Sequence, residues 1–218
     1  MSEVLFRLAG VHFAYDKQRV VLREANFELR RGERIALVGR NGAGKTTLFH
    51  LMVGLQRPQS GTIEAFGKIR NAEKDFVEVR ARAGLLFQDS DDQLFCPTVA
   101  EDVAFGPLNL GKTALEARAI VRRTLSSLGL EGFETRITHK LSGGQRRLVA
   151  LAAVLAMEPD VLLLDEPTNA LDAETEARLT DILVALPQTL MVISHDEDFL
   201  ARVTGKRIHL RDGQIVAA

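Results

Sequence analysis

The sequence predicts an α/β fold with a mainly parallel sheet core, an antiparallel β subdomain and an inserted helical subdomain. Two observations favour the parallel core. Short apolar segments typical of buried strands alternate with segments of helical periodicity. One of these strands, RIALVG at 34–39, runs through a glycine-rich loop into the helical pattern KTTLFHLMVG. A strand followed by a loop and a helix is the building unit of a parallel sheet.

The opening of the chain alternates strand and turn patterns. EVLFRLAG at 3–10 and VHFAY at 11–15 are predicted as two strands. ANFELR at 25–30 alternates apolar and polar residues and ends at the turn RRGE. These short strands precede the α/β pattern in the sequence.

The middle of the chain is more helical. Its clearest helix is TALEARAIVRRTLSSLG at 113–129, with Gly129 as the stop. The apolar run 148–157 predicts a buried helix and is too short to cross a bilayer. We expect the inserted helical subdomain to extend over approximately 89–158.

The last part of the chain returns to the α/β pattern. We expect a strand at 161–166, a helix at 174–186, a strand at 189–194 and a hairpin around Asp212-Gly213. The chain is predicted to be one domain, 1–218, with no room for an additional C-terminal domain after the hairpin.

Composition narrows the classes of function. The 218 residues carry 28 basic and 29 acidic side chains, so no overall basicity indicates nucleic acid as a partner. Cys96 is the single cysteine, which fits a reducing compartment and predicts a buried, inert thiol. No apolar run is long enough to span a membrane, and the N-terminus lacks the pattern of a secretory signal. We therefore expect a cytosolic chain that reaches a membrane only through a partner.

The glycine-rich loop GRNGAGKT at 39–46 fits the pattern G-x-x-x-x-G-K-[ST] between a strand and a helix. Glycines let backbone N–H groups turn inward around phosphate oxygens, and the start of a helix adds a positive dipole. Lys45 is expected to reach the β- and γ-phosphates, and the Thr46 hydroxyl to hold Mg²⁺. The predicted ATP-binding residues of this loop are Gly39, Asn41, Gly42, Ala43, Gly44, Lys45, Thr46 and Thr47.

A second acidic motif, VLLLDE at 161–166, ends a strand that is predicted to be buried. Asp165 is the candidate ligand of Mg²⁺, and Glu166 is placed to polarise the attacking water. Two solvated acids at the end of a strand are the alternative. The phosphate loop in the same chain makes that alternative the weaker one.

The motif LSGGQ at 141–145 predicts another anion-binding helix start, which Ser142 can cap. The chain thus has two helix N-termini suited to phosphate and one nucleotide loop. The simplest explanation is that the second serves a nucleotide held by another copy of the chain.

The order of these motifs strongly resembles the ATP-binding-cassette (ABC) ATPases, which are P-loop NTPases, over nearly the whole chain. The resemblance implies that Tyr15 stacks on adenine and that Gln88 is the Q-loop glutamine, near Mg²⁺ and the attacking water. It implies that His195 contacts the γ-phosphate, so that the catalytic residues are Glu166, His195 and Gln88. NALD at 169–172 resembles the D-loop, from whose usual form Asn169 departs.

The same resemblance implies the cofactors ATP and Mg²⁺ and a head-to-tail dimer. The residues expected to reach the partner's ATP are Ser142, Gly143, Gly144, Gln145 and Asp172. Mg²⁺ would be held by Thr46, Gln88 and Asp165. Both a homodimer and a heterodimer remain open.

The acidic stretch FQDSDDQLF at 87–95 lies where the family receives a short helix from a membrane subunit. We expect Phe87, Leu94 and Phe95 to line this partner groove, with acidic residues at its rim that suit a basic helix. A solvated acidic loop is the alternative, and a calcium loop is excluded because Leu94 stands where its glycine is required. The predicted rim residues are Asp89, Asp91 and Asp92.

The longer phrase 87–111 closely resembles the ATPases of energy-coupling-factor (ECF) transporters, especially those of cobalt and nickel uptake. This implies a transmembrane coupling protein and a substrate-binding membrane component as partners, no nucleic acid, and a peripheral place on the cytoplasmic face of the inner membrane. A vitamin importer such as one for biotin, another ABC transporter, or a soluble ABC ATPase are the alternatives.

Overall fold

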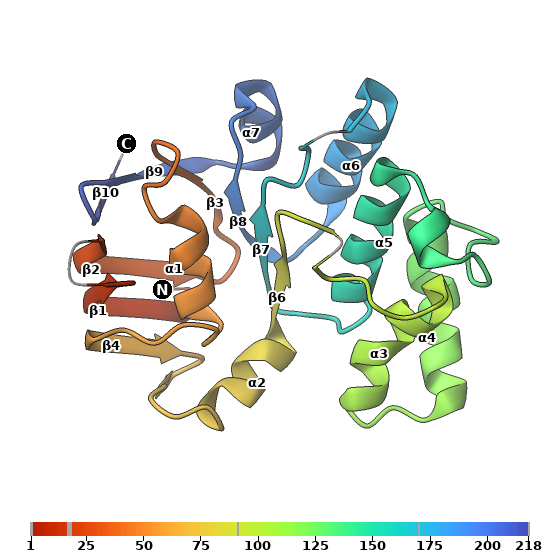
Figure 1. The fold of residues 1–218 in the computed structure, drawn as a ribbon, viewed down its shortest axis with the longest axis horizontal. Helices are drawn as coiled ribbons and strands as arrows, with labels where there is room; N and C mark the ends of the chain where they lie inside the picture. The colour runs from red at the N-terminus through yellow and green to blue at the C-terminus, as the bar shows by residue number, and fades with distance from the viewer. Residues whose placement is uncertain (1, 17–18, 91, 170, 218) are drawn as a thin grey trace.

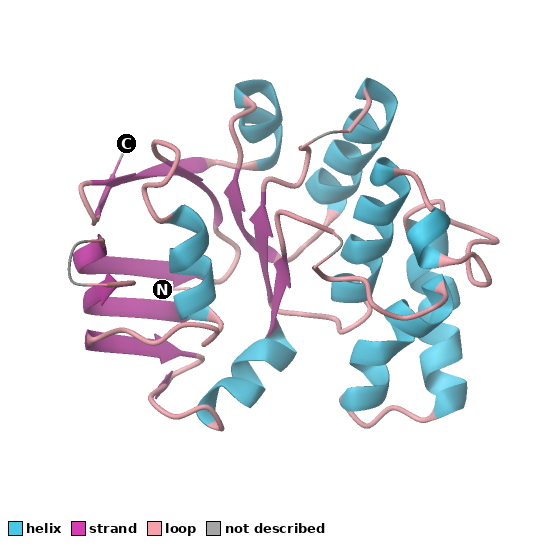
Figure 2. Cartoon of the chain, viewed as in Figure 1, coloured by secondary structure: helices cyan, strands magenta, loops and turns pink. Residues whose placement is uncertain are grey.

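The computed structural model describes residues 2–16, 19–90, 92–169 and 171–217, which form two sheets and the helices around them (Figures 1 and 2). A four-stranded antiparallel sheet has the order β2-β1-β4-β5, and a six-stranded sheet has the order β10-β9-β3-β8-β7-β6. In the six-stranded sheet β9 and β10 pair antiparallel, and the other four pairs, β9 with β3, β3 with β8, β8 with β7 and β7 with β6, are parallel. The predicted α/β class with a mainly parallel core is confirmed.

The antiparallel sheet is built from β1 (Val4–Ala14), β2 (Val20–Arg30), β4 (Ser60–Ala65) and β5 (Lys68–Ile69). The prediction of two strands in 3–15 is wrong, because β1 continues through Gly10. Gly10 has φ 60° and its N–H donates to Asn26 Oδ1 at 2.9 Å, while the pairing register shifts on both neighbouring strands beside it. A bulge of this kind absorbs an irregular residue without ending the strand.

The six-stranded sheet takes its strands from distant parts of the chain. β3 (Arg34–Val38) pairs with β8 (Thr189–Ile193) and β9 (Lys206–Arg211). β7 (Val161–Asp165) lies between β8 and β6 (Ala83–Leu86), and β10 (Gln214–Ala217) closes the opposite edge as the predicted hairpin with β9. The carboxyl ends of β3, β7 and β8 therefore meet at one edge, where α/β proteins bind their ligands.

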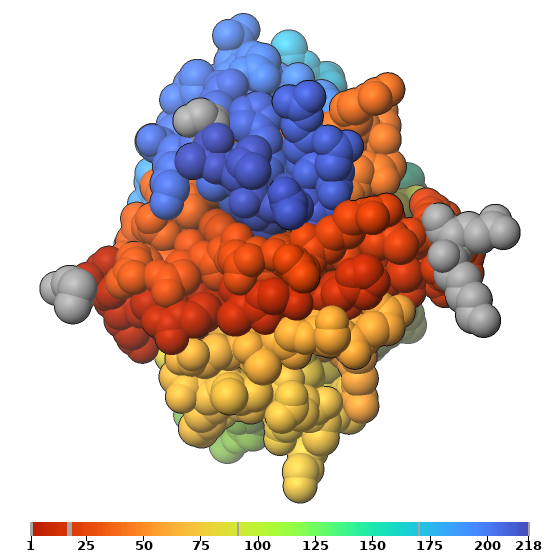
Figure 3. Space-filling view, turned by 90° about the vertical axis from the view of Figure 1, so that its left-hand side faces the viewer, coloured from red at the N-terminus to blue at the C-terminus, as the bar shows by residue number. Residues whose placement is uncertain are grey.

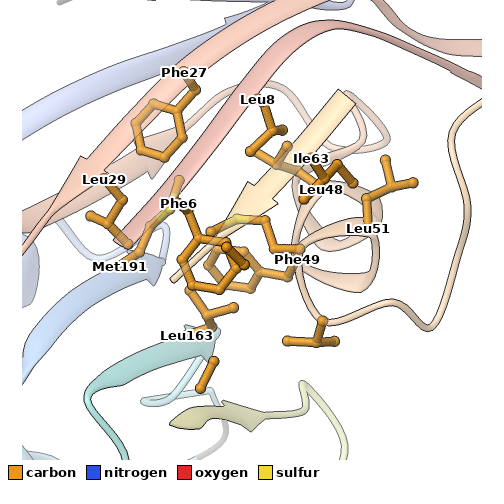
Figure 4. Packing of buried hydrophobic residues seen from close by; sticks show 14 of the residues in the cluster. Phe6, Leu8, Phe27, Leu29, Leu48, Phe49, Leu51, Ile63, Leu163 and Met191 are labelled. Carbon is orange, nitrogen blue, oxygen red and sulfur yellow. The ribbon is translucent and has the colours of Figure 1, made fainter. Parts of the chain in front are cut away.

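Alternation along these strands divides the apolar core into two clusters. Ile35, Leu163 and Met191 face the first cluster, with residues of β1, β2 and α1 (Lys45–Met52). Figure 4 shows Leu163 and Met191 packed among them. Their chain neighbours, such as Ala36 and Leu162, face the second cluster, with the helices on the other side. Since successive strand residues point to opposite faces, strands of continuous apolar sequence are covered on both sides.

The remaining helices are α2 (Asp75–Arg82), α3 (Val99–Asn109), α4 (Ala114–Ser127), α5 (Gly143–Leu155), α6 (Ala173–Ala185) and α7 (Glu197–Val203), with a short 3₁₀ turn at Thr138–Lys140. The helices α3, α4 and α5 pack on one another at the side away from the antiparallel sheet (Figure 1). Thr98 and Thr113 cap α3 and α4, each with a glutamate three residues later. The bounds 89–158 for a separate helical subdomain remain a prediction.

The opposite side of the molecule is the antiparallel sheet. In Figure 3 the N-terminal strands form a band between the C-terminal segment above and the segment that contains β4, β5 and α2 below. Within the described part of the chain, none of the helices has the length and apolar character that crossing a membrane requires.

Gly54 and Gly67 have nearly the same φ but different surroundings. Substituting each by alanine therefore distinguishes the cost of the left-handed backbone from the cost of overpacking. A Cβ added at Gly54, with φ 73°, would lie 2.2 Å from the Phe76 ring, whereas one at Gly67, with φ 74°, would meet nothing within 4 Å. We expect Gly67→Ala to lower the free energy of unfolding by about 1 kcal/mol, the cost of a left-handed alanine. Gly54→Ala adds overpacking and should lower it by about 2–4 kcal/mol in total.

Urea unfolding of both variants, followed by circular dichroism, measures this difference. Equal loss of stability in the two variants would contradict the packing of Phe76 against Gly54.

Candidate functional site

The phosphate loop connects β3 to α1, and glycine conformations shape it. Gly42 and Gly44 have φ 76° and 103°, and a Cβ on Gly44 would lie 2.1 Å from Val21 Cγ1. Lys45 begins α1, is 8% exposed, and donates from Nζ to the Gly39 carbonyl at 2.9 Å. Burial lowers the pKa of Lys45, while the carboxylates of Glu166 and Asp165 oppose that shift. The loop therefore holds the Lys45 ammonium group at the N-terminus of α1, where nearby carboxylates only partly offset the effect of burial.

The two predicted metal-binding side chains meet across the sheet edge. Thr46 Oγ1, from the first turn of α1, donates to Asp165 Oδ2 at 2.6 Å, at the carboxyl end of β7. Burial raises the pKa of Asp165, against the hydrogen bond from Thr46 and the nearby cations of Lys45 and Arg147. A hydroxyl and a carboxylate in contact are the hard oxygen ligands that Mg²⁺ requires.

Glu166 and His195 follow the neighbouring strands β7 and β8. His195 Nε2 lies 3.3 Å from Glu166 Oε1, and the Glu166 side chain is 15% exposed. The Glu166 N–H donates to the Ile193 carbonyl at 2.9 Å, and its φ is 47°, in the left-handed region that costs a non-glycine residue energy. The structure thus places a carboxylate and an imidazole together beside the phosphate loop.

One hollow of about 810 Å³ brings most of the predicted nucleotide and catalytic residues together. Its lining includes Tyr15, Asn41, Gly42, Gly44, Lys45, Thr46, Thr47, Gln88, Asp165, Glu166 and His195. Gly39 and Ala43 belong to the same loop but line the neighbouring hollow beside the β9–β10 hairpin. The shape and the lining suit a polyphosphate ligand bound at the loop.

Tyr15 lies at the edge of this hollow. Its hydroxyl is 3.0 Å from Thr47 Oγ1, and the Arg19 guanidinium carbon lies 5.4 Å from the centre of its ring. Tyr15 is 49% exposed, so part of its side chain is accessible at this rim. Its stacking on adenine remains a prediction.

The motif LSGGQ starts α5 away from this hollow. Ser142 Oγ accepts from the Gln145 N–H at 3.2 Å, and the Ser142 N–H donates to Gln145 Oε1 at 3.1 Å, which completes a capping box. Asp172 caps α6 and accepts from Thr175, and these bonds lower its pKa. The predicted in-trans residues Ser142, Gly143, Gly144, Gln145 and Asp172 are absent from the described lining of the nucleotide hollow.

The predicted partner-groove residues are divided among three neighbouring hollows. Phe87 and Phe95 line an apolar hollow of about 240 Å³, and Leu94 lines another with Phe95. Asp89 and Asp92 line a third with Gln88, nearer the nucleotide hollow, and Asp91 lies outside the described residues. Phe87 also lines this third hollow, so it joins the acidic residues there, whereas Leu94 and Phe95 lie in the other two hollows.

Phe105, on α3, is an apolar groove residue that the sequence reasoning missed. Its ring packs edge-on against Phe95 with 4.8 Å between centres, and both side chains are largely exposed. Buried Asp102 accepts from the N–H groups of Phe95 and Cys96 and fixes this loop on α3. Burial raises the pKa of Cys96 to about 11, which keeps its thiol protonated and inert near neutral pH.

Two further sets of residues were missed. Thr168, Asn169, Glu176 and Asp196 line the nucleotide hollow. Arg147 is 2% exposed and binds backbone carbonyls beside the site. The sequence did contain a signal that Arg147 is buried. It lies four and seven residues before Leu151 and Val154, which places it on the apolar face of α5.

Comparison with known proteins shows to which family the chain is similar. A family model described as ABC transporter matches residues 22–169. A protein of Nitratidesulfovibrio vulgaris, provisionally named an ABC transporter ATP-binding protein, is 51% identical over 96% of this chain and 77% of its own length. The energy-coupling factor transporter ATP-binding protein EcfA of Methanocaldococcus jannaschii is 43% identical over 94% of this chain and 75% of its own.

Two solved structures extend the likeness to the fold. A structure of cbiO1 from Clostridium perfringens, described as part of the ABC transporter complex cbiONQ, has a TM-score of 0.87 at 34% identity, covering 98% of this chain and 87% of that one. A dimeric structure of the ATP-binding cassette MJ0796, in a post-hydrolysis state with ADP and Pi, has a TM-score of 0.87 at 26% identity, covering 96% of both chains. The likeness covers both sheets and the helices.

Proposed function

Because this chain belongs to the ABC transporter family, whose ATP-binding proteins hydrolyse ATP, we propose that it is the ATPase subunit of an ECF-type importer. The observation that carries the proposal is the convergence of Lys45, Thr46, Asp165, Glu166 and His195 on one hollow at the carboxyl edge of the sheet. A phosphate loop, a metal-binding pair and a carboxylate beside an imidazole are the parts that phosphoryl transfer to water requires.

The residues have distinct roles in this proposal. The loop N–H groups and Lys45 bind the phosphates, and Thr46, Asp165 and Gln88 hold Mg²⁺. The ion supplies positive charge against the phosphate oxygens. Glu166 orients and polarises the attacking water, and His195, 3.3 Å from Glu166, contacts the γ-phosphate. Water then displaces ADP from the γ-phosphorus, giving phosphate.

A second copy is proposed to complete each site. The capped N-terminus of α5 does not line the nucleotide hollow of its own chain in the described residues. A head-to-tail dimer, homomeric or heteromeric, would bring Ser142, Gly143, Gly144, Gln145 and Asp172 to the partner's ATP. The dimeric relative with ADP and Pi supports this arrangement.

The proposed membrane contact is the apolar hollow lined by Phe87, Phe95 and Phe105. We expect it to receive a short amphipathic helix of a transmembrane coupling protein, with Asp89, Asp91 and Asp92 drawing basic residues toward it. Gln88 follows Phe87 directly and lines the nucleotide hollow, so a shift of the docked helix is transmitted to the site.

Phe95→Asp should weaken assembly with the membrane protein by about 10-fold or more, because the charge would be buried beneath the docked helix. Leu115→Asp is the matched control, since Leu115 is an exposed apolar residue on α4 outside this hollow. Both variants should retain basal ATPase activity. Equal recovery of the membrane protein with both variants would contradict the proposed docking surface.

The whole proposal is tested by purification from detergent-solubilised native membranes, using a tagged Glu166→Gln chain with ATP and Mg²⁺. We expect a multi-helix membrane protein with basic cytosolic helices and a small substrate-binding membrane protein. Recovery of soluble partners alone, ribosomal or DNA-bound, would overturn the transporter role and leave the ATPase activity in place.

The proposed substrate is a transition-metal ion, cobalt or nickel, and the proposed location is the cytoplasmic face of the inner membrane, at its periphery. The support for the substrate is the resemblance of 87–111 to the ATPases of cobalt and nickel uptake, and the likeness to cbiO1, which is part of an ABC transporter complex, supports the place at the membrane. A vitamin such as biotin is the second candidate. Binding of Co²⁺, Ni²⁺ or biotin by the purified complex would distinguish them.

A further inference from the structure

Arg147 occupies an unusual position on α5. It follows the motif LSGGQ by two residues, yet its side chain is buried, with the whole residue 2% exposed. Its guanidinium donates to four backbone carbonyls, those of Phe87, Asp165, Glu166 and Pro167. The planar fork of arginine can hold several acceptors in fixed directions at once, which the single ammonium of lysine cannot.

The four carbonyls belong to two segments that the proposed chemistry uses. Three lie in consecutive residues, Asp165, Glu166 and Pro167, with distances of 3.1 Å to Asp165 O and 3.0 Å to Pro167 O. The fourth is Phe87 O, at 2.5 Å, in the residue before Gln88. One buried side chain therefore joins the signature helix, the carboxyl end of β7 and the start of the Q-loop.

The Glu166 backbone needs such support. Its φ of 47° is in the left-handed region, which is costly for a residue with a Cβ. Its carbonyl accepts from Arg147 and from the Asn169 N–H at 3.1 Å, and its own N–H donates to Ile193 O. Contacts on both sides of the Glu166 Cα thus fix the direction in which its side chain leaves the backbone.

Burying the Arg147 guanidinium removes a positive charge from water, which is unfavourable. Burial lowers the pKa of Arg147, against the charges of Asp165, Asp89 and Glu166. A buried charge is tolerated when backbone oxygens replace its water, but packing alone would be served as well by an apolar side chain. The directed hydrogen bonds are the property that a methionine or leucine at this position could not supply.

We propose that Arg147 is a positioning residue, which fixes the backbone of Glu166 and couples it to the Q-loop and to the signature helix. The inference rests on the proposed roles of Glu166 and Gln88. It gives Arg147 no part in binding phosphate or metal. Any movement of α5 toward a partner copy would act on the Glu166 backbone through this guanidinium.

The test compares Arg147→Lys with a matched arginine. Arg34, at the start of β3, also donates to three backbone carbonyls, those of Leu183, Leu186 and Val203, at the other end of the sheet. Each variant is assayed about 10 °C below its own Tm, with kcat and KM for ATP and with the Kd of a fluorescent ATP analogue. We expect Arg147→Lys to lower kcat about 10-fold or more with KM and Kd within about threefold, and Arg34→Lys to lower Tm but keep kcat.

A double variant separates positioning from general structure. If Arg147 acts through Glu166, Arg147→Lys in the Glu166→Gln background should lower kcat by less than about twofold, because the function it supports is already absent. Arg147→Gln is the second variant and should resemble Arg147→Lys. Wild-type kcat in a folded Arg147 variant, an equal kcat loss in Arg34→Lys, or failure of both Arg147 variants to fold would overturn the proposal.

The outcomes also distinguish this inference from the proposed function. Glu166→Gln with wild-type turnover would contradict the role of Glu166 and remove the basis of the inference. An inactive Glu166→Gln chain beside a fully active Arg147→Lys chain would contradict the inference alone.

Discussion

Glu166→Gln is expected to lower kcat for ATP hydrolysis by about 100- to 10,000-fold, the usual contribution of a positioned general base. The amide is nearly isosteric with the carboxylate, so the 15% exposed side chain keeps its place beside His195. Because it cannot accept a proton from the attacking water, the ATP-bound state persists. Phosphate release measures kcat, and a fluorescent analogue should show a Kd within about threefold of wild type.

Glu176→Gln is the matched control for this prediction. Glu176 also lines the nucleotide hollow, and burial together with the neighbouring Asp196 raises its pKa. Its kcat should stay within about threefold of wild type, since Glu176 is given no role in catalysis. Size-exclusion chromatography with ATP and Mg²⁺ should retain the Glu166→Gln chain as a dimer. Wild-type turnover by Glu166→Gln would exclude it as the group that polarises the water.

Lys45→Met should weaken ATP binding by about 10- to 100-fold, because a charge-assisted contact with phosphate is lost. Its stability without nucleotide should change little. Lys45 is 8% exposed, burial lowers its pKa, and its hydrogen bonds go to Gly39 O and Arg40 O of the same loop. Removing a poorly hydrated cation offsets the loss of those bonds.

Thermal unfolding with and without ATP distinguishes the two effects. ATP at about 100 times the wild-type Kd stabilises the wild-type chain by about 2.7 kcal/mol, and a 10- to 100-fold weaker Kd should reduce this stabilisation to about 0.4–1.4 kcal/mol in Lys45→Met. Lys112→Met, an exposed lysine before α4, should respond to ATP as wild type does. An undiminished ATP-dependent rise of Tm in Lys45→Met would contradict the placement of Lys45 against the phosphates.

The sequence was sufficient for the parts of the site that are local in the chain. The loop 39–46 lies between one strand and one helix, and Asp165 and Glu166 end another strand, so pattern and spacing place them at the same sheet edge. The capping of α5 by Ser142 follows from three neighbouring residues. Such features depend on interactions within a few positions, which a linear pattern contains.

The rest depends on pairs of residues that are distant in the chain. The role of Arg147 arises because Phe87 O and Pro167 O lie on either side of it, 60 and 20 residues away. The contact of Phe105 with Phe95 needs the packing of α3, and the continuity of β1 needs the side chain of Asn26. For the acidic stretch 87–95, the sequence likewise gives the composition but does not predict which of its side chains line the same hollow.

The strand order also has a consequence for folding during synthesis on the ribosome. β3, which leads into the phosphate loop, has both of its partners in β8 and β9, within 189–211. The chain is made from its N-terminus, and such distant pairing is intrinsically slow to form. The antiparallel sheet can assemble as soon as β5 has emerged, whereas β3 can pair only after almost the whole polypeptide has been made. A ribosome-bound nascent chain that ends near residue 180 therefore has every residue of the phosphate loop but not the sheet that orders it.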